Sequence, residues 1–161
     1  MVVGTWAAAT LWDDRAGFEE GRVMLEAGGL AALSTTLIKY AAGRSRPNET
    51  NAVDDWRNSG DSFLSMHVST AFAVGTVLAE SGGDDYRWLR RGIGYGLATA
   101  TAYARLDSNA HWLSDTVAGA ALGIATAQFA LGRRHGLDPR SAVTVVPVDG
   151  GAMLTYSLQL E

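Results

Sequence analysis

The sequence has no cysteine, only three prolines, and no excess of basic residues. Without cysteine the chain can form no disulfide bond, no thiolate nucleophile and no zinc–sulfur site, and the redox state of its compartment stays open. Acidic side chains outnumber basic ones by 17 to 13, which gives a net charge of −4. A nucleic-acid partner is therefore not expected, because such proteins carry a basic surface.

A long, strongly apolar run is also missing. The longest apolar stretch, residues 113–132, carries Asp115 near its start and many Ala and Gly residues, which contribute little transfer free energy. It predicts a buried core helix rather than a membrane span, so the chain is expected to be soluble. Residues 1–14 have neither a basic n-region nor a long apolar h-region, so a secretory signal is either absent or already removed.

The 161 residues are 47% hydrophobic and 19% charged, which is the composition of one folded domain spanning residues 1–161. Apolar stretches of helical length alternate with clusters of Gly, Asp, Asn and Arg, a pattern that predicts an all-α helical bundle with its core at about 18–132. The expected helices cover about 18–42, 65–80, 86–104 and 109–132. The polar residues 48–61 between the first two predict a long loop.

Two further structural expectations concern the second half of the chain. In the helix at 86–104, the large apolar residues are candidate core positions: Trp88, Leu89, Ile93 and Leu97. After Pro139, two β-rich runs flank the turn signal "DGG", which predicts a β-hairpin over about 142–160. Because an isolated hairpin is only marginally stable, we expect it to pack on the bundle.

The segment 104–115, "ARLDSNAHWLSD", contains a His–Asp pair. If His111 and Asp115 lie on one helix, they share a face, and the carboxylate can accept a hydrogen bond from one imidazole nitrogen. Ser108 or Asn109 would cap this helix and place His111 in its first turn, where free N–H groups favour an anion. Taken alone, a capping Asn followed by an incidental His–Asp pair is the commoner explanation.

His67 repeats this arrangement, because Ser62 or Ser65 can cap the helix in which it lies. Two helix starts that each carry a His could face one anion. Basic residues that such an anion needs are also present: Lys39, Arg46 and Arg105. Each is commonly a surface charge, but together they indicate a phosphate site, because a guanidinium fork matches phosphate oxygens and an ammonium supplies a compact charge.

Three segments, "KYAAGRSRP", "LSMH" and "ARLDSNAHWLSD", resemble the signature of the type 2 phosphatidic acid phosphatase superfamily, which includes bacterial acid phosphatases and vanadium haloperoxidases. The family pattern has Lys followed by Arg-Pro, then Pro-Ser-Gly-His, then Ser-Arg followed by His and Asp. Order and spacing agree over residues 39–115. The positions that match are Lys39, Arg46, Pro47, Ser65, His67, Arg105, His111 and Asp115.

The resemblance implies a helical bundle of the acid phosphatase/vanadium haloperoxidase type and a metal-independent phosphoric ester hydrolase. In that family's mechanism His111 would attack phosphorus and form a phosphohistidine, Asp115 would hold its ring, and His67 would protonate the leaving oxygen. The implied phosphate-binding residues are Lys39, Arg46, Ser65, Met66 and Arg105. No cofactor is implied, and vanadate is expected to inhibit as a phosphate mimic.

The chain departs from the family pattern at three positions: Leu64 replaces Pro, Met66 replaces Gly and Ala104 replaces Ser. These departures leave two alternatives open, a vanadate-dependent haloperoxidase and a non-catalytic relative that binds phosphorylated ligands. Chain length favours the phosphatase over the haloperoxidase, whose members are generally much larger.

The sequence does not choose between a lipid phosphate and a small phosphomonoester as substrate, and it gives no oligomeric state. Family resemblance predicts a periplasmic or otherwise extracytoplasmic location, with peripheral membrane contact compatible with a lipid substrate. The loop 48–61 is expected beside the pocket, with Trp56 either selecting substrate or anchoring the loop. His135, in "GRRHG" outside the three segments, is assigned a capping or surface role.

Overall fold

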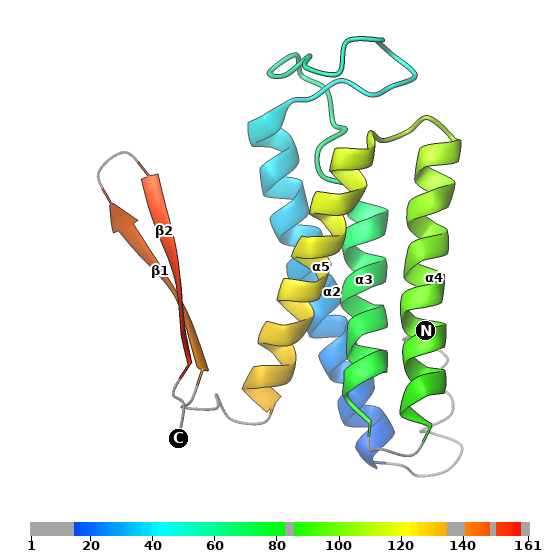
Figure 1. The fold of residues 1–161 in the computed structure, drawn as a ribbon, viewed down its shortest axis with the longest axis vertical. Coiled ribbons are helices and arrows are strands. Elements are labelled where there is room, and N and C mark those ends of the chain that lie inside the picture. The colour runs from blue at the N-terminus through cyan, green and yellow to red at the C-terminus, as the bar shows by residue number, and fades with distance from the viewer. Residues whose placement is uncertain (1–14, 83–85, 135–140, 149–150, 159–161) are drawn as a thin grey trace.

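A computed structural model describes residues 15–82, 86–134, 141–148 and 151–158. Its helices are α2 (Arg15–Ala42), α3 (Met66–Glu80), α4 (Arg87–Asp107) and α5 (Leu113–Arg134). They pack side by side as a bundle, which confirms the all-α class (Figure 1). The strands β1 (Ser141–Val148) and β2 (Gly151–Leu158) pair antiparallel, with Ser141 opposite Leu158. A stable hairpin packed on the bundle, and a single domain over the whole chain, stay predictions.

Helix α3 occupies the centre of the bundle and contacts α2, α4 and α5. Helix α2 ends where Gly43 adopts a φ of +55° and its N–H bonds the carbonyl of Lys39 at 2.9 Å. Glycine suits this left-handed position because it has no Cβ. The chain then forms a loop over residues 43–65 at one end of the bundle, above the last turn of α2 and the first turn of α3 (Figure 1).

The core is built mainly from small side chains, which let the helices approach closely. Its buried residues are Val23, Met24, Ala27, Ala31, Ala73, Val77, Ala127, Ala130 and Leu131. Helix α3 touches α4 through glycine backbones, since a Cβ on Gly94 would lie 2.4 Å from the carbonyl oxygen of Gly75. It approaches α5 in the same way, since a Cβ on Gly123 would lie 2.2 Å from the carbonyl oxygen of Ser69.

The predicted core positions of α4 are wrong. Trp88, Leu89, Ile93 and Leu97 are between 41% and 76% exposed, whereas Gly94 and Ala98 are the buried residues of this helix. The buried Gly94 and Ala98 each follow directly after one of the large apolar residues, Ile93 and Leu97. The small residues face α3 because close helix contact leaves no room for large side chains. In the part of the chain that the structure describes, no helix has both the length and the hydropathy to cross a bilayer.

Replacing Gly94 by Ala should destabilise the protein by about 1–3 kcal/mol, because the new Cβ would force α4 away from the α3 backbone. The matched control is Gly92→Ala on the same helix, where an added Cβ meets nothing within 4 Å. That variant should instead be stabilised by roughly 0.5–1 kcal/mol, since alanine favours a helix interior. Urea unfolding measures both, and equal effects would contradict the close α3–α4 contact.

Candidate active site

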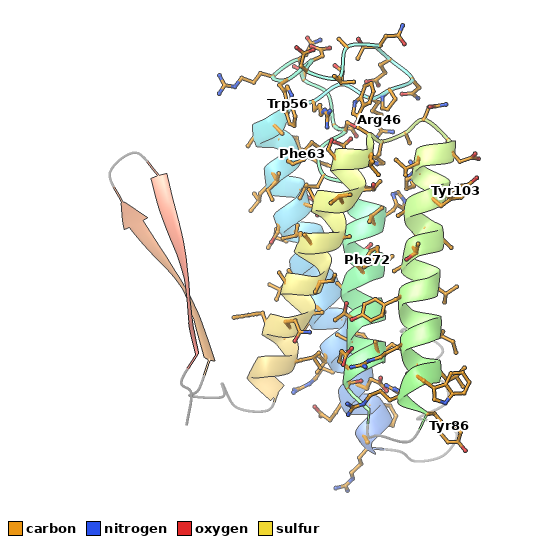
Figure 2. All side chains as sticks on the ribbon, viewed as in Figure 1. Arg46, Trp56, Phe63, Phe72, Tyr86 and Tyr103 are labelled. Atoms are coloured by element: carbon orange, nitrogen blue, oxygen red, sulfur yellow. The ribbon has the colours of Figure 1, made fainter. Side chains whose placement is uncertain are left out.

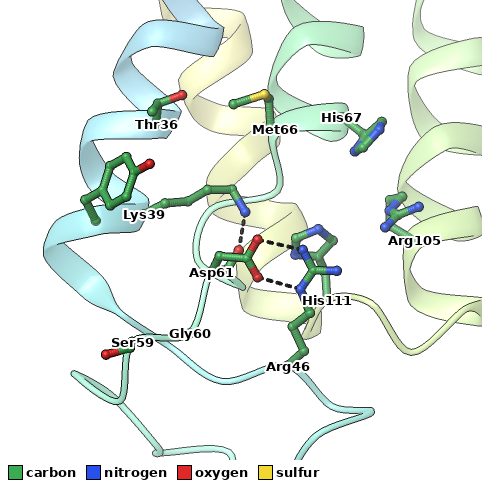
Figure 3. A pocket seen from close by; sticks show the side chains of 11 residues that line it. Thr36, Lys39, Arg46, Ser59, Gly60, Asp61, Met66, His67, Arg105 and His111 are labelled. Carbon is green, nitrogen blue, oxygen red and sulfur yellow. Dashed lines mark hydrogen bonds and ion pairs between the residues drawn. The ribbon is translucent and has the colours of Figure 1, made fainter.

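A pocket of about 370 Å³ lies where the ends of α2, α3 and α4 meet the loop 43–65. Six of the residues that the sequence predicts for the site line it, as Figure 3 shows: Lys39, Arg46, Met66, His67, Arg105 and His111. Five others complete the lining: Thr36, Tyr40, Ser59, Gly60 and Asp61. The three sequence segments therefore converge on one cavity, and the C-terminal part of the predicted loop 48–61 borders it.

The basic residues of the pocket come from three elements. Lys39 lies in the last turn of α2, Arg46 in the loop, and Arg105 in the last turn of α4, which extends further than predicted. Burial lowers the pKa of Lys39, and the charge of Asp61 opposes this effect. The Nε of Arg105 is buried and has no hydrogen-bond partner among the described residues, so it is a free donor. This arrangement suits a polyanionic ligand.

His67 is the second residue of α3 and lines the pocket beside Arg105 (Figure 3). Partial desolvation lowers its pKa below the ordinary 6.5, and the charges of Arg105 and His111 lower it further. His67 is therefore mostly neutral at neutral pH. A bound phosphate dianion would counteract these charges and favour the protonated imidazole.

His111 precedes α5 rather than lying in its first turn, because the helix begins at Leu113. Its Nδ1 is 2.8 Å from the carbonyl oxygen of Ser62. A carbonyl only accepts hydrogen bonds, so in the neutral imidazole Nδ1 carries the proton and Nε2 keeps the lone pair. The imidazole of His111 also lines the pocket (Figure 3). This tautomer leaves Nε2 as the ring nitrogen without a proton.

The side chains of His111 and Asp115 meet as predicted, but Oδ2 lies 3.8 Å from Nδ1, which is longer than a hydrogen bond. The two residues do not share a helical face, because one precedes the helix and the other is its third residue. Ser108 and Asn109 do not cap α5 as predicted, because Ser108 caps the C-terminus of α4 and Asn109 follows it in the turn. The backbone carbonyl of Ser62 is the hydrogen-bond acceptor nearest to Nδ1 of His111, and the Asp115 carboxylate lies beyond it.

Asp115 is fully buried and joins the start of α5 to the loop. Its carboxylate accepts the N–H of Trp112 at 2.9 Å, one half of a capping box, and also accepts bonds from the Ser62 hydroxyl and the Arg44 guanidinium. Burial alone raises the pKa of this carboxyl. The imidazole of His111, the hydroxyl of Ser62, the N–H of Trp112 and the charge of Arg44 together outweigh burial, so the pKa is lowered and Asp115 is an anion at neutral pH.

No pattern in the sequence singles out Arg44, yet it is the ion-pair partner of Asp115 and only 5% exposed. Its guanidinium also donates to the Ser114 hydroxyl at 2.7 Å and to the Val53 carbonyl at 2.6 Å. The ring centroids of Trp56 and Trp112 lie 4.6 Å and 5.4 Å from its central carbon. A buried carboxylate requires a cation, and this requirement is the signal that could have identified Arg44.

Trp56 lies outside the pocket lining and packs edge-on against Phe63, with ring centroids 5.1 Å apart (Figure 2). This geometry fits the loop-anchor alternative. Ser65, the N-cap residue of α3, is fully buried and does not line the pocket, and its hydroxyl has no partner among the described residues. Its predicted role in phosphate binding stays a prediction.

The three departures from the family pattern lie in different environments. Met66 lines the pocket, Leu64 is buried, and Ala104 is exposed on α4 away from the pocket lining. His135 lies outside the described residues. Within the described ranges, no group of three or more His, Asp or Glu side chains is arranged to hold a metal ion.

The sequence model of the PAP2 superfamily matches residues 21–136. Lipid A 1-phosphatase from Porphyromonas gingivalis is 38% identical over 86 residues, which make up 53% of this chain and 17% of that relative. The chain thus spans only a minor part of that protein's length. No solved structure matches the chain.

Proposed function

Because the chain belongs to the PAP2 superfamily, we propose that it is a phosphatase that hydrolyses a phosphate ester through a phosphohistidine. The observation that supports this proposal most directly is the pairing of two histidines with three basic side chains around one pocket. One histidine, His111, has its Nδ1 held by a carbonyl, which leaves Nε2 available for attack.

In the first step, Nε2 of His111 attacks phosphorus and the bond to the leaving oxygen breaks, while His67 donates a proton to that oxygen. In the second step, His67 takes a proton from water, and the water oxygen displaces Nε2 from phosphorus to release inorganic phosphate. Charge on the equatorial oxygens would be stabilised by Lys39, Arg46 and Arg105. Backbone N–H groups at the start of α3 would contribute further donors.

A lipid phosphate is the proposed substrate class. Support comes from the similarity to an enzyme named for action on lipid A, although the shared segment is a small part of that enzyme. Action on a lipid phosphate would require peripheral membrane contact or access from a micelle. An extracytoplasmic location stays a prediction.

The test is phosphate release from phosphatidic acid in detergent micelles, compared with glucose 6-phosphate and a nucleoside monophosphate. We expect faster turnover of the lipid, unchanged activity in EDTA, and inhibition by vanadate. Preference for the soluble esters would contradict the lipid assignment. Phosphate binding without release or a phosphoenzyme would identify a non-catalytic relative. Oxidation of bromide by added hydrogen peroxide, catalysed by the vanadate-loaded protein, would identify a haloperoxidase.

The acid role of His67 predicts a leaving-group effect. His67→Ala should slow an alkyl phosphate by roughly 10²–10⁴-fold and an aryl phosphate much less, because an aryl oxide leaves without a proton. The reaction needs protonated His67, and the pKa of this residue in the free protein is lowered below 6.5. For the wild type, kcat/KM with the alkyl ester should therefore fall as pH rises through that lowered value. Equal losses for both esters would argue against the acid role.

A further inference from the structure

Asp61 is the carboxylate that lines the pocket within the part of the chain that the structure describes. Its Oδ1 accepts a hydrogen bond from Nε of Arg46 at 2.7 Å, and its Oδ2 accepts one from a terminal nitrogen of Arg46 at 2.8 Å (Figure 3). Lys39 donates to the backbone carbonyl of the same residue. Asp61 therefore engages two of the three basic side chains that the proposed function assigns to phosphate.

The two parallel bonds from Arg46 match the fork geometry with which a guanidinium binds either a carboxylate or a phosphate. In the structure the Asp61 carboxylate occupies donors that a pair of phosphate oxygens would need. The hydrogen bond from Arg46 lowers the pKa of Asp61, so this competing anion is present at neutral pH.

We propose that Asp61 determines the phosphate affinity of this pocket, because its carboxylate holds the Arg46 fork until a phosphate replaces it. The inference rests on the proposed function, which places phosphate on Arg46. Binding is then an exchange of one anion for another on the same donors. Release of inorganic phosphate is the reverse exchange, in which the carboxylate returns to Arg46 as the product leaves.

The structure allows this exchange by rotation of one side chain. The Asp61 side chain is 60% exposed, so it has room to move into solvent. The backbone on either side is held, because Gly60 N–H bonds the Gly43 carbonyl at 3.2 Å and Ser62 N–H bonds the Arg44 carbonyl at 2.9 Å. The loop can therefore stay in place while the carboxylate leaves Arg46.

The test measures direct binding of inorganic phosphate and of vanadate to the whole chain by isothermal titration calorimetry. Asp61→Asn removes the charge and keeps the shape, and Asp61→Ala removes the contact. Both variants should bind phosphate about threefold to tenfold more tightly. The Asp61 carboxylate would no longer compete for Arg46, and its negative charge would no longer repel the bound phosphate dianion. The control is Asp54→Asn, an exposed residue of the same loop outside the pocket lining, which loses the same charge and should shift affinity less than about twofold.

Tighter binding by both Asp61 variants, but not by Asp54→Asn, would support the exchange. Unchanged phosphate binding by the Asp61 variants would overturn the exchange. Weaker binding would also overturn it, because Asp61 would then serve to position Arg46 for the ligand. Turnover and phosphohistidine trapping test the proposed function separately. If the wild type binds phosphate but forms no phosphoenzyme, the proposed catalysis is refuted, whereas the proposed exchange at Arg46 is not. Absence of phosphate and vanadate binding in every variant would overturn both.

Discussion

His111→Ala should reduce phosphate release by at least roughly 10³-fold, because the reaction loses the nitrogen that attacks phosphorus. Steady-state assays on the preferred ester measure this loss. Rapid quenching with a radiolabelled substrate should show a phosphoenzyme in the wild type and none in the variant. Near-native turnover by His111→Ala would refute the assignment of the nucleophile.

The fold of this variant should persist. The imidazole makes one hydrogen bond that the structure records, to the Ser62 carbonyl, so its removal should cost on the order of 1 kcal/mol. Thermal unfolding and inorganic phosphate binding provide the controls. A variant that retains both, while losing turnover, separates a catalytic defect from unfolding.

The largest effect on stability is expected at Arg44. Arg44→Ala should lower the free energy of unfolding by about 3–5 kcal/mol, because it leaves the buried carboxylate of Asp115 without its ion-pair partner. Urea unfolding measures the loss. The control is Arg22→Ala, which breaks an ion pair to Glu19 whose side chains are both at least half exposed and should cost less than about 1 kcal/mol.

A second substitution separates charge from packing. If the penalty comes from an unpaired buried charge, Asp115→Asn introduced into Arg44→Ala should recover part of the stability, although it is destabilising on its own. Additive losses in the double variant would show that Arg44 acts through packing against Trp56 and Trp112 rather than through Asp115.

The sequence predicted the convergence of the site because its residues are tied to helix ends. Lys39 and Arg105 lie in the last turns of α2 and α4, and His67 lies in the first turn of α3. Apolar periodicity locates such ends to within a few residues, and the spaced segments say which of them belong together. The roles assigned to these residues are still predictions.

Other features depend on tertiary contacts that periodicity does not encode. The Arg44–Asp115 pair joins residues 71 positions apart. The hydrogen bond between Asp61 and Arg46 forms only because the folded loop brings the two side chains together. The start of α5 was placed too early, which gave His111 the wrong hydrogen-bond partner. On α4, hydropathy favoured the large residues, whereas contact with α3 selected the small ones.

The group that orients His111 belongs to the main chain of residue 62. Any amino acid at this position supplies a carbonyl, so the tautomer of the His111 imidazole can survive the loss of the serine side chain. The hydroxyl of the same residue binds Asp115 and is removed by a single substitution. During evolutionary drift, the stability of the loop would therefore change before the orientation of the imidazole, provided that the backbone path from Arg44 to Ser62 is maintained.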